Sequence, residues 1–555
     1  MEGSLMNGAE LLTRELSRLG VKHVFGFPGE STLPLAVALT KPQMPSHVIA
    51  GCEKCAGYMA DGYARFSDRL AACYSPGGIG SPLLLPSLLE AHNSSIPLLF
   101  ISISEATHKL GKWSTSSFDH SAFNCVVKAN FRVDRIERLV SRTREAVRLA
   151  ATPRTGPCHL DIPYDVLTAS YEVQDAGQSF APEAVYPRHR IRADENTIRR
   201  VRQLIERARS PLMILGGGVQ LARVQAGLIT QFAELYDVRL VSTLNGKGAV
   251  HEVENSRFLG VIGQKGRSDI NKFVRGCDLV MLLGTKMGDK SSLNWTLLGS
   301  DQSVIQVDVD PAEIGRNFNV REGVLSDAEA FLEDMIAAGA NQAERGPRSF
   351  PDLNAAPPAS GLIPRMCSIL SGKLEGEDLL IADASQACGW MGSYFRPTLR
   401  SRGTASPRGT GSIGFALPAA IGAATARPKS CIAVIGGDGG LLMSMHEMET
   451  AARLGIKLRF FLLNNNNRLG LLENHLEHLY GVKGALGQRN SVDWQLICNA
   501  FRWDYLAISS ESEMEKTIDT AFASSAPVLV DVKSDDQLSP DFQNTLSVAD
   551  RRLRE

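Results

Sequence analysis

A glycine-rich turn between two short apolar runs is the feature that most constrains the fold of this chain. The first run, Cys431 to Ile435, ends at the turn Gly436-Gly437-Asp438-Gly439-Gly440. A helical pattern over Leu441 to Leu454 and a second apolar run, Leu458 to Leu463, follow the turn. Short apolar runs bounded by turns are typical of buried parallel strands, and a helix between them makes a βαβ unit. The segment therefore predicts a doubly wound α/β domain.

The same segment carries groups that suit a phosphate and a divalent cation. Glycines let backbone N–H groups approach a phosphate closely, and the start of the following helix favours anionic oxygens. Mg²⁺ prefers oxygen donors and takes few of them from the protein. We therefore expect Asp438, Asn465 and the Asn467 carbonyl to bind a metal ion. The alternative is an ordinary βαβ unit with a polar, asparagine-rich turn.

Length and charge restrict the class of protein. A chain of 555 residues is too long for a single core. The 59 basic and 60 acidic residues give a net charge of −1, so no electrostatic field favours nucleic acid or an anionic membrane. The N-terminus lacks the pattern of a signal peptide, and no apolar segment is long enough to span a bilayer. We expect a cytoplasmic enzyme that acts on small molecules.

Breaks in the sequence pattern divide the chain into three blocks. Residues 171–190 and 340–360 are polar and contain prolines without periodicity, which is typical of connecting segments. We expect domains over residues 1–170, 190–340 and 360–540. The ten cysteines show no secreted-domain framework. The one CxxC, Cys52 to Cys55, is interpreted as two packed thiols on a helix rather than as a redox pair.

Segments from all three blocks resemble the thiamin-diphosphate (ThDP) enzymes. A GDG turn, followed by one helix, one strand and an asparagine pair, resembles the motif that binds the cofactor in that family. The resemblance covers essentially the whole chain and implies three doubly wound parallel-sheet domains: pyrimidine-binding, central Rossmann-like and diphosphate-binding. The other segments that carry it are Gly26 to Gly29, Glu53, Ala60 to Arg65, Ser75 to Gly78, Ile381 to Gln386 and Gly409 to Pro418.

The resemblance implies roles for individual residues. Glu53 is expected to be catalytic, because a carboxyl group in an apolar pocket holds its proton tightly and can share it with N1′ of the cofactor pyrimidine. Otherwise, a glutamate at a helix start is usually solvated. Ile413 is expected to wedge the cofactor into a bent conformation, and the Gly411 carbonyl to orient its amine. The other expected cofactor-binding residues are Pro28, Gly29, Ser385, Gln386, Ser412, Gly437, Asp438, Gly439, Gly440 and Asn465.

The middle block gives a weaker signal for a second cofactor. Apolar runs at Leu212 to Leu215, Leu279 to Gly284 and Val304 to Val309 predict a Rossmann-like sheet. The central domain of the family binds FAD in some members and nothing in others. Because Gly216 to Gly218 do not form a GxGxxG turn, FAD is a minor alternative here.

The resemblance is greatest to the acetolactate synthase and pyruvate oxidase group. It implies decarboxylation of a 2-oxo acid such as pyruvate, followed by carboligation, with ThDP and Mg²⁺ as cofactors. Three segments depart from the acetolactate synthase pattern. Gly80 stands where an asparagine is usual, Phe118-Asp119-His120 stands where Phe-Gln-Glu is usual, and Arg468 to Glu473 replaces the common short turn after the metal loop. The alternatives are a non-oxidative 2-oxo acid decarboxylase, a flavin-linked oxidation to an acyl phosphate, and a catalytically silent ThDP-binding paralogue.

Three further residues and the oligomeric state stay open at this point. Glu30, His92 and His120 either contribute to the substrate site or have structural roles. In the family, a ThDP site is shared between two chains, so the resemblance implies a homodimer or homotetramer with shared active sites.

Overall fold

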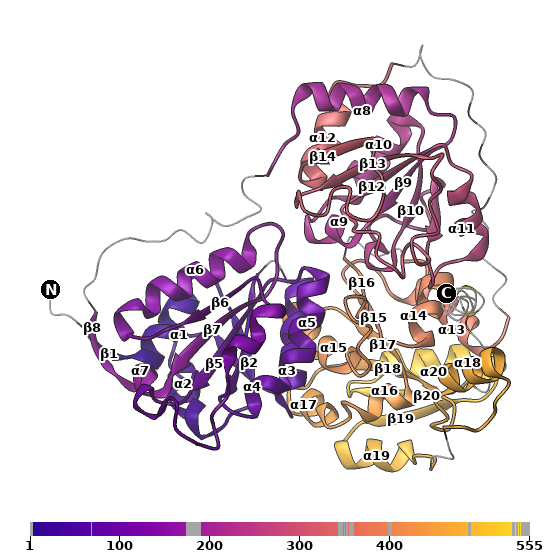
Figure 1. The fold of residues 1–555 in the computed structure, drawn as a ribbon. Coiled ribbons are helices and arrows are strands. Elements are labelled where there is room, and N and C mark those ends of the chain that lie inside the picture. The colour runs from indigo at the N-terminus through magenta and orange to yellow at the C-terminus, as the bar shows by residue number, and fades with distance from the viewer. Residues whose placement is uncertain are drawn as a thin grey trace. The chain divides into compact units, whose positions relative to one another are not determined.

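The computed structural model describes two compact units (Figure 1). The first contains Met1–His189, Pro407–Lys429 and Ser444–Ile456, and the second contains Arg190–Ser406, Ser430–Met443 and Lys457–Glu555. The predicted connectors, 171–190 and 340–360, lie largely outside the described residues. The structure describes all residues except 1–3, 68, 174–189, 342–347, 349, 351–352, 354–359, 398–401, 487–489, 535–538, 540–541, 543 and 545–555.

The first unit is built on a parallel six-stranded sheet with the order β3-β2-β4-β5-β7-β6. All seven residues of β5 are buried, which explains why its sequence does not alternate between apolar and polar residues. Helices α1 and α6 pack together on one face, whereas α3 and α5 lie on the other (Figure 1). The strands are β2 (His23–Gly26), β3 (Ser46–Ile49), β4 (Ala71–Pro76), β5 (Leu98–Ser104), β6 (Ala129–Arg132) and β7 (Cys158–Pro163), and an antiparallel pair joins β1 (Ser4–Asn7) to β8 (Ser170–Val173).

The helices of the first unit come from three stretches of the chain. The longest stretch supplies α1 (Gly8–Arg18), α2 (Leu33–Leu39), α3 (Glu53–Phe66), α4 (Gly80–Leu83), α5 (Leu85–Ser94), α6 (Leu139–Ala151) and α7 (Tyr164–Thr168), and the short 3-10 turns η1 (Glu30–Thr32), η2 (Thr107–Lys109), η3 (His120–Cys125) and η4 (Ile136–Arg138). The other two supply α15 (Ala416–Ala426) and α17 (Glu447–Arg453).

Two glycines allow α15 to lie directly on α3. A Cβ atom on Gly62 would lie 2.1 Å from the Ala419 carbonyl oxygen, and one on Gly422 would lie 1.8 Å from the Met59 carbonyl oxygen. Both positions therefore require glycine, because any side chain would force the helices apart. This contact places residues 407–429 beside the first sheet.

The central sheet of the second unit has the order β11-β10-β9-β12-β13-β14. Counted along the chain this is 3-2-1-4-5-6, the order of the Rossmann fold. Its strands are β9 (Pro211–Leu215), β10 (Arg239–Ser242), β11 (Phe258–Val261), β12 (Leu279–Leu283), β13 (Ser303–Asp308) and β14 (Glu322–Leu325). Its helices are α8 (Glu195–Arg207), α9 (Gly217–Leu221), α10 (Ala226–Tyr236), α11 (Ser268–Arg275) and α12 (Ala328–Ala338), with the 3-10 turn η6 (Leu244–Gly246).

The third sheet, also in the second unit, has the order β16-β15-β17-β18-β20-β19. Its strands are β15 (Leu379–Ala382), β16 (Thr404–Ala405), β17 (Ile432–Gly437), β18 (Leu458–Asn464), β19 (Asp504–Ile508) and β20 (Val528–Lys533). Its helices are α13 (Leu362–Lys373), α14 (Gln386–Tyr394), α16 (Asp438–Leu442), α18 (Gly470–Tyr480), α19 (Trp494–Phe501) and α20 (Glu511–Ala523). The prediction of three doubly wound parallel sheets is confirmed.

One predicted element is wrong in its extent. The helix expected over Leu441 to Leu454 is divided into α16 and α17, and residues 443–446 between them are not helical. The chain passes from the second unit to the first at this break, between Met443 and Ser444. The helix is thus interrupted where the chain changes units, so the tertiary structure overrides the local helical pattern.

Candidate cofactor site

Asp438 lies directly after β17 and is bonded to the loop that follows β18. Its Oδ1 accepts a hydrogen bond from the Gly439 N–H (2.7 Å), and its Oδ2 accepts bonds from the N–H groups of Asn465 (3.3 Å) and Asn467 (2.6 Å). Because β17 and β18 are neighbouring parallel strands, their carboxyl ends meet at one edge of the sheet. The structure thus brings together the three residues predicted to bind a metal ion.

The loop after β18 has an unusual backbone that suits this arrangement. Asn466 and Asn467 both have a φ of 59°, in the left-handed region that asparagine tolerates better than most residues. The Asn467 Oδ1 is buried and has no hydrogen-bond partner in the structure. A buried oxygen without a donor, close in sequence and space to a carboxylate, fits a site for a hard cation.

The residues expected to contact phosphate lie at the ends of β15 and β17. These neighbouring strands connect to opposite sides of the sheet, through β16 and β18, which makes their carboxyl ends the topological switch point where ligands bind in such sheets. A Cβ atom on Gly437 would meet nothing within 4 Å, so the backbone there is open to a ligand. Gly439 and Gly440 follow in α16.

Ser385 and Gln386, at the start of α14, are already hydrogen-bonded within the chain. The Ser385 Oγ accepts a bond from the Ala387 N–H (3.0 Å), and the Gln386 Oε1 accepts one from the Ser539 N–H (2.8 Å). Ser385 therefore caps α14, and Gln386 binds the C-terminal segment. These bonds leave the Gln386 amide NH₂ as a donor for an anion.

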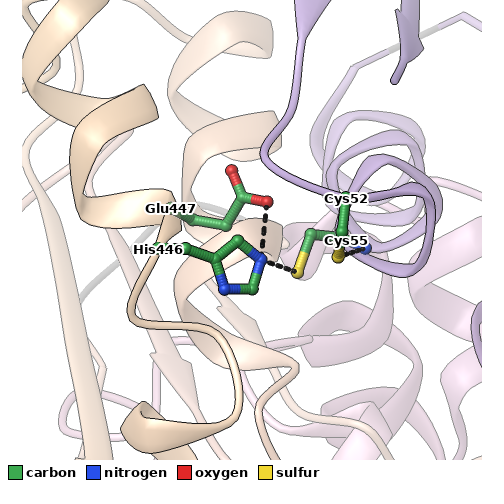
Figure 2. Close-up of side chains that lie close together, drawn as sticks. All are labelled: Cys52, Cys55, His446 and Glu447. Atoms are coloured by element: carbon green, nitrogen blue, oxygen red, sulfur yellow. Dashed lines mark hydrogen bonds and ion pairs between the residues drawn. The ribbon is translucent and has the colours of Figure 1, made fainter. Parts of the chain in front are cut away.

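Glu53 is the first residue of α3 and is buried, with only 7% of its surface exposed. Desolvation by this burial raises the pKa of Glu53 above its ordinary value. A Cβ atom on Gly80 would lie 2.8 Å from the Glu53 Oε1, so the carboxyl group lies against the backbone at Gly80. The burial excludes the alternative of a solvated surface glutamate. The turn before α3 also carries Cys52, whose Sγ caps the helix (Figure 2).

The Pro28-Gly29 turn lies next to the strand end that leads to Gly80. A Cβ atom on Gly29 would lie 2.9 Å from the Pro76 Cβ, and the Gly29 N–H donates a hydrogen bond to the Thr32 Oγ1 (2.9 Å). Because β2 and β4 are neighbouring strands, this turn and Gly80 lie at the same edge of the first sheet.

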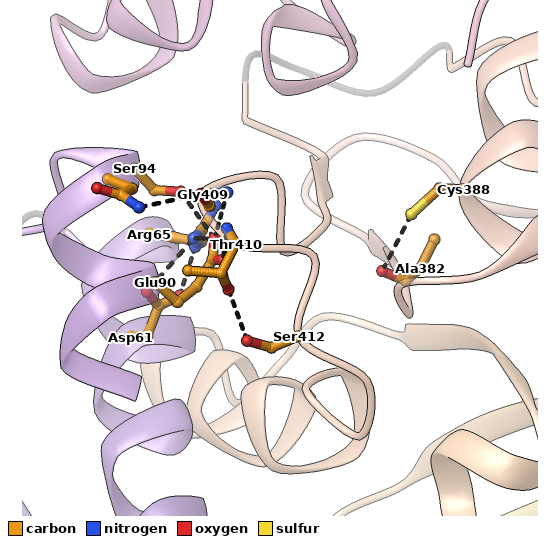
Figure 3. Close-up of polar contacts among 10 residues, drawn as sticks. Asp61, Arg65, Glu90, Ser94, Ala382, Cys388, Gly409, Thr410 and Ser412 are labelled. Carbon is orange, nitrogen blue, oxygen red and sulfur yellow. Dashed lines mark hydrogen bonds and ion pairs between the residues drawn. The ribbon is translucent and has the colours of Figure 1, made fainter. Parts of the chain in front are cut away.

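The loop that carries Gly411, Ser412 and Ile413 is held by a buried glutamate of α5 (Figure 3). The Glu90 Oε1 accepts a hydrogen bond from the Gly409 N–H (2.9 Å), and its Oε2 accepts bonds from the N–H (2.7 Å) and Oγ1 (2.8 Å) of Thr410. Ile413 beyond this anchor is 48% exposed, which excludes an ordinary core role and leaves its side chain available to a ligand.

Glu90 itself belongs to a buried ion-pair network. Arg65 donates hydrogen bonds to Asp61 and to the Glu90 Oε1 (3.2 Å), and the side chains of Asp61 and Glu90 are fully buried. Although burial works against the charge, these carboxylates raise the pKa of Arg65. The sequence analysis missed Glu90. The signal that could have revealed it is a single carboxylate within an otherwise apolar helical stretch, which requires a partner when buried.

The predicted site residues form two groups, each within one compact unit. The first unit holds Pro28, Gly29, Glu53, Gly411, Ser412 and Ile413, and the second holds Ser385, Gln386, Gly437, Asp438, Gly439, Gly440, Asn465 and Asn467.

The structure also places the three residues whose roles were left open. His120 is buried, and its Nδ1 lies 2.8 Å from the Asp161 Oδ1 and 3.0 Å from the Ser102 Oγ, which supports the structural interpretation. Glu30 is exposed at the start of η1. His92 lies in the last turn of α5, and its carbonyl oxygen accepts a hydrogen bond from Arg154 (3.3 Å).

The glycines of the central domain have a packing role. A Cβ atom on Gly216 would lie 2.1 Å from the Gly284 carbonyl oxygen, and one on Gly218 would lie 2.8 Å from the same atom. They let the start of α9 approach the end of β12 closely.

Within the described part of the chain, every helix is too short or too polar to cross a membrane.

Family models match most of the chain. The N-terminal TPP binding domain of the thiamine pyrophosphate enzymes matches residues 6–123, the central domain matches residues 198–335, and the C-terminal TPP binding domain matches residues 383–532.

Several proteins are similar over nearly their full length. The chain is 26% identical to a probable acetolactate synthase large subunit of Methanococcus aeolicus, over 96% of this chain and 92% of the relative. It is 28% identical to the acetolactate synthase isozyme 1 large subunit of Escherichia coli K12, over 95% and 94%. In fold, it matches a ThDP-dependent 4-hydroxybenzoylformate decarboxylase of Rhodococcus jostii RHA1, with a TM-score of 0.83 at 20% identity, over 96% of this chain and 100% of that one. The chain therefore belongs to the thiamine pyrophosphate enzymes.

Proposed function

We propose that this protein uses ThDP and Mg²⁺ to decarboxylate a 2-oxo acid such as pyruvate and to join the product to a second carbonyl compound, as acetolactate synthases do. The observation that carries the proposal is that the chain holds both a buried Glu53, in one unit, and the hydrogen-bonded Asp438 loop, in the other. Its full-length relatives are named as acetolactate synthases. The retained Glu53 and Asp438 argue against a catalytically silent paralogue.

The donor sets of the chain fit the two cofactors. Asp438, Asn465 and Asn467 supply carboxylate and amide oxygens, which suit Mg²⁺ and disfavour softer ions. The open backbone at Gly437 and the Gln386 amide would face the diphosphate, and Ile413 would support the ring system. Bound ThDP supplies an electron sink for the carbanion that decarboxylation leaves.

The chain itself supplies proton control and positioning. Burial raises the pKa of Glu53, which favours the protonated carboxyl group, and this group would share its proton with the pyrimidine N1′. Glu90 fixes Gly409 and Thr410, and through them the exposed Ile413 that would hold the cofactor in its bent form. The Glu53 carboxyl group lies against the backbone at Gly80, and the residue is buried.

A second candidate function is a simple 2-oxo acid decarboxylase, in which a proton captures the carbanion. The observation in its favour is Gly80, which places bare backbone beside Glu53 where acetolactate synthases usually have an asparagine. We further propose a homodimer or homotetramer with shared active sites, since the predicted residues divide between two units.

The test is NMR of the purified protein with ThDP, Mg²⁺ and pyruvate, followed over time, with Glu53→Gln as the control. Acetolactate or acetoin in the wild type alone supports carboligation. Acetaldehyde alone identifies the decarboxylase. If pyruvate is not consumed although ThDP binds, pyruvate is the wrong donor, and a panel of larger 2-oxo acids is tested in the same way. Bound yellow flavin in the purified protein would point to the flavin-linked alternative.

A further inference from the structure

Four potential metal ligands gather beside Glu53, outside the proposed cofactor contacts. Cys52 and Cys55 come from the start of α3, and His446 and Glu447 come from the start of α17 (Figure 2). One ligand atom from each residue can be chosen so that all four lie within 4.8 Å of one another. All four residues belong to the first unit, so the cluster does not depend on how the two units are arranged.

Two separations within the cluster match those of ligands around one ion. The Cys55 Sγ lies 3.6 Å from the His446 Nε2, and this nitrogen lies 3.3 Å from the Glu447 Oε1. Tetrahedral zinc, with bonds of about 2.3 Å to sulfur and about 2.0–2.1 Å to nitrogen, places sulfur and nitrogen ligands about 3.5 Å apart, and nitrogen and oxygen ligands about 3.4 Å apart. An ion would therefore fit with little movement of the side chains.

The surroundings hold one ligand in place while leaving the cluster accessible. Glu447 is buried, its Oε1 accepts a hydrogen bond from the Gly51 N–H (2.9 Å), and its Oε2 accepts one from the Thr450 Oγ1 (2.7 Å). Contacts of this kind orient the ligands of structural metal sites. Cys55 is also buried, whereas Cys52 and His446 are partly exposed, which provides a route for the ion.

We propose that Cys52, Cys55, His446 and Glu447 bind one Zn²⁺ ion. On binding, the two thiols lose their protons to solvent, and His446 ligates through Nε2 as a neutral imidazole that keeps its proton on Nδ1. Two thiolates select zinc over Mg²⁺, which prefers oxygen ligands. Since all four positions are filled by side chains, the site is structural. It ties the turn before Glu53 to α17, 391 residues away in sequence from Cys55.

The CxxC spacing, to which the sequence analysis assigned no chemistry, is common to zinc sites and redox pairs. His446 and Glu447, at the start of α17, favour zinc, because a redox-active dithiol pair needs neither of them.

The experiment measures bound metal directly. The reduced full-length protein, loaded with ThDP and Mg²⁺, is dialysed against metal-free buffer, and its zinc content is measured by mass spectrometry. We expect about one zinc per chain in the wild type and in Cys125→Ser, which removes an exposed cysteine elsewhere in the same unit. We expect at least a tenfold loss in Cys52→Ser and His446→Gln, and an unchanged content in His108→Gln, an exposed histidine control.

Cobalt provides a second readout that does not depend on activity or on the metal acquired during expression. Zinc-depleted wild type should take up Co²⁺ with the visible bands of a tetrahedral site and a thiolate charge-transfer band, and both should be absent in Cys52→Ser. Folding of each variant is checked by circular dichroism. Because His446 is partly exposed, its replacement by glutamine tests the site even if a cysteine variant does not fold.

The proposal is wrong if the reduced wild type retains no zinc and takes up no Co²⁺. It is also wrong if such metal-free protein instead loses two hydrogens per chain when treated with a small-molecule disulfide, with Cys52 and Cys55 bonded in the product. That outcome would identify a redox pair that passes its two electrons to the added disulfide.

Discussion

The first and third sheets have the same strand order but carry different residues at the ends of their strands. Counted along the chain, each sheet runs 2-1-3-4-6-5. In the third sheet, the third strand is followed by Asp438 and the fourth by the asparagines at 465–467. In the first sheet, the third strand is followed by Gly77 to Gly80, and the acidic group beside it is Glu53, from the start of a helix. Topology thus provides a binding edge, and the residues at the strand ends decide its chemistry.

The two regions also differ in how far apart their partners lie in sequence. Asp438 and Asn467 are 29 residues apart. In the first unit, Glu90 binds Thr410 from a distance of 320 residues, and Gly51 binds Glu447 from a distance of 396. The edge that carries Asp438 and Asn467 is therefore a local structure on one sheet, whereas the surroundings of Glu53 depend on the whole first unit.

The largest effect is expected from Glu53→Gln. Glutamine keeps the size of the side chain but cannot hold the transferable proton, so we expect kcat to fall by about 10²- to 10⁴-fold. Initial rates with pyruvate test this, alongside thermal unfolding. Glu137→Gln, at an exposed position in η4, should keep wild-type activity. A fall of less than about tenfold in Glu53→Gln would contradict the proposed role.

Asp438→Asn tests the other region. The change removes the only side-chain charge of the proposed metal site, so we expect Mg²⁺ affinity to fall by at least about 100-fold. Calorimetric titration of Mg²⁺ into protein with ThDP measures it, and Asp301→Asn, an exposed control in the same unit, should bind normally. Since the site is local, the unfolding of the first unit should not change. Unaltered Mg²⁺ binding would remove Asp438 from the site.

Glu90→Gln should have a smaller effect, which is divided between stability and cofactor binding. It leaves the bonds to Thr410 in part but removes a charge that faces Arg65, so we expect a loss of about 1–3 kcal/mol in the free energy of unfolding and a higher KM for ThDP. Denaturant titration measures the first quantity. Glu145→Gln removes an exposed ion pair with Arg142 and should cost less than about 1 kcal/mol. Equal losses in both variants would argue against an anchoring role for Glu90.

The last effect to test is the acid sensitivity of the first sheet. Burial lowers the pKa of His159 to about 3, with smaller influences from His120 and Asp161. An unfolded histidine binds a proton below about pH 6.5. The unfolded chain therefore binds more protons between these values, and stability falls as the pH falls from about 6.5 towards 3.

His159→Gln should reduce the slope of the unfolding free energy against pH, by at most about 1.4 kcal/mol for each pH unit. Unfolding free energies measured between pH 7 and 4 test the prediction, and the comparison uses the slopes because the variant also loses contacts at neutral pH. Parallel slopes for the wild type and the variant would show that His159 is not the titrating group.

The parts of the fold that could be predicted are those with local signals. The strands β17 and β18, the turn at Asp438 and the asparagines after β18 all lie in one βαβ unit, where apolar runs and glycines mark the boundaries. The burial of Glu53 also agrees with the expectation from family resemblance. The helix over Leu441 to Leu454 was predicted wrongly, because its pattern carries no sign that the chain changes units at Ser444.

The sequence by itself determined the α/β class, the family and the local grouping of Asp438 with the asparagines after β18, since hydrophobic periodicity and short motifs act over a few tens of residues. Only the tertiary structure decided which distant groups meet. Glu90 with Thr410, and Cys55 with His446, come together because α15 and α17 return to the first unit after more than 300 residues. Such contacts leave no periodic pattern in the chain, because they depend on the packing of whole elements and not on the spacing of neighbours.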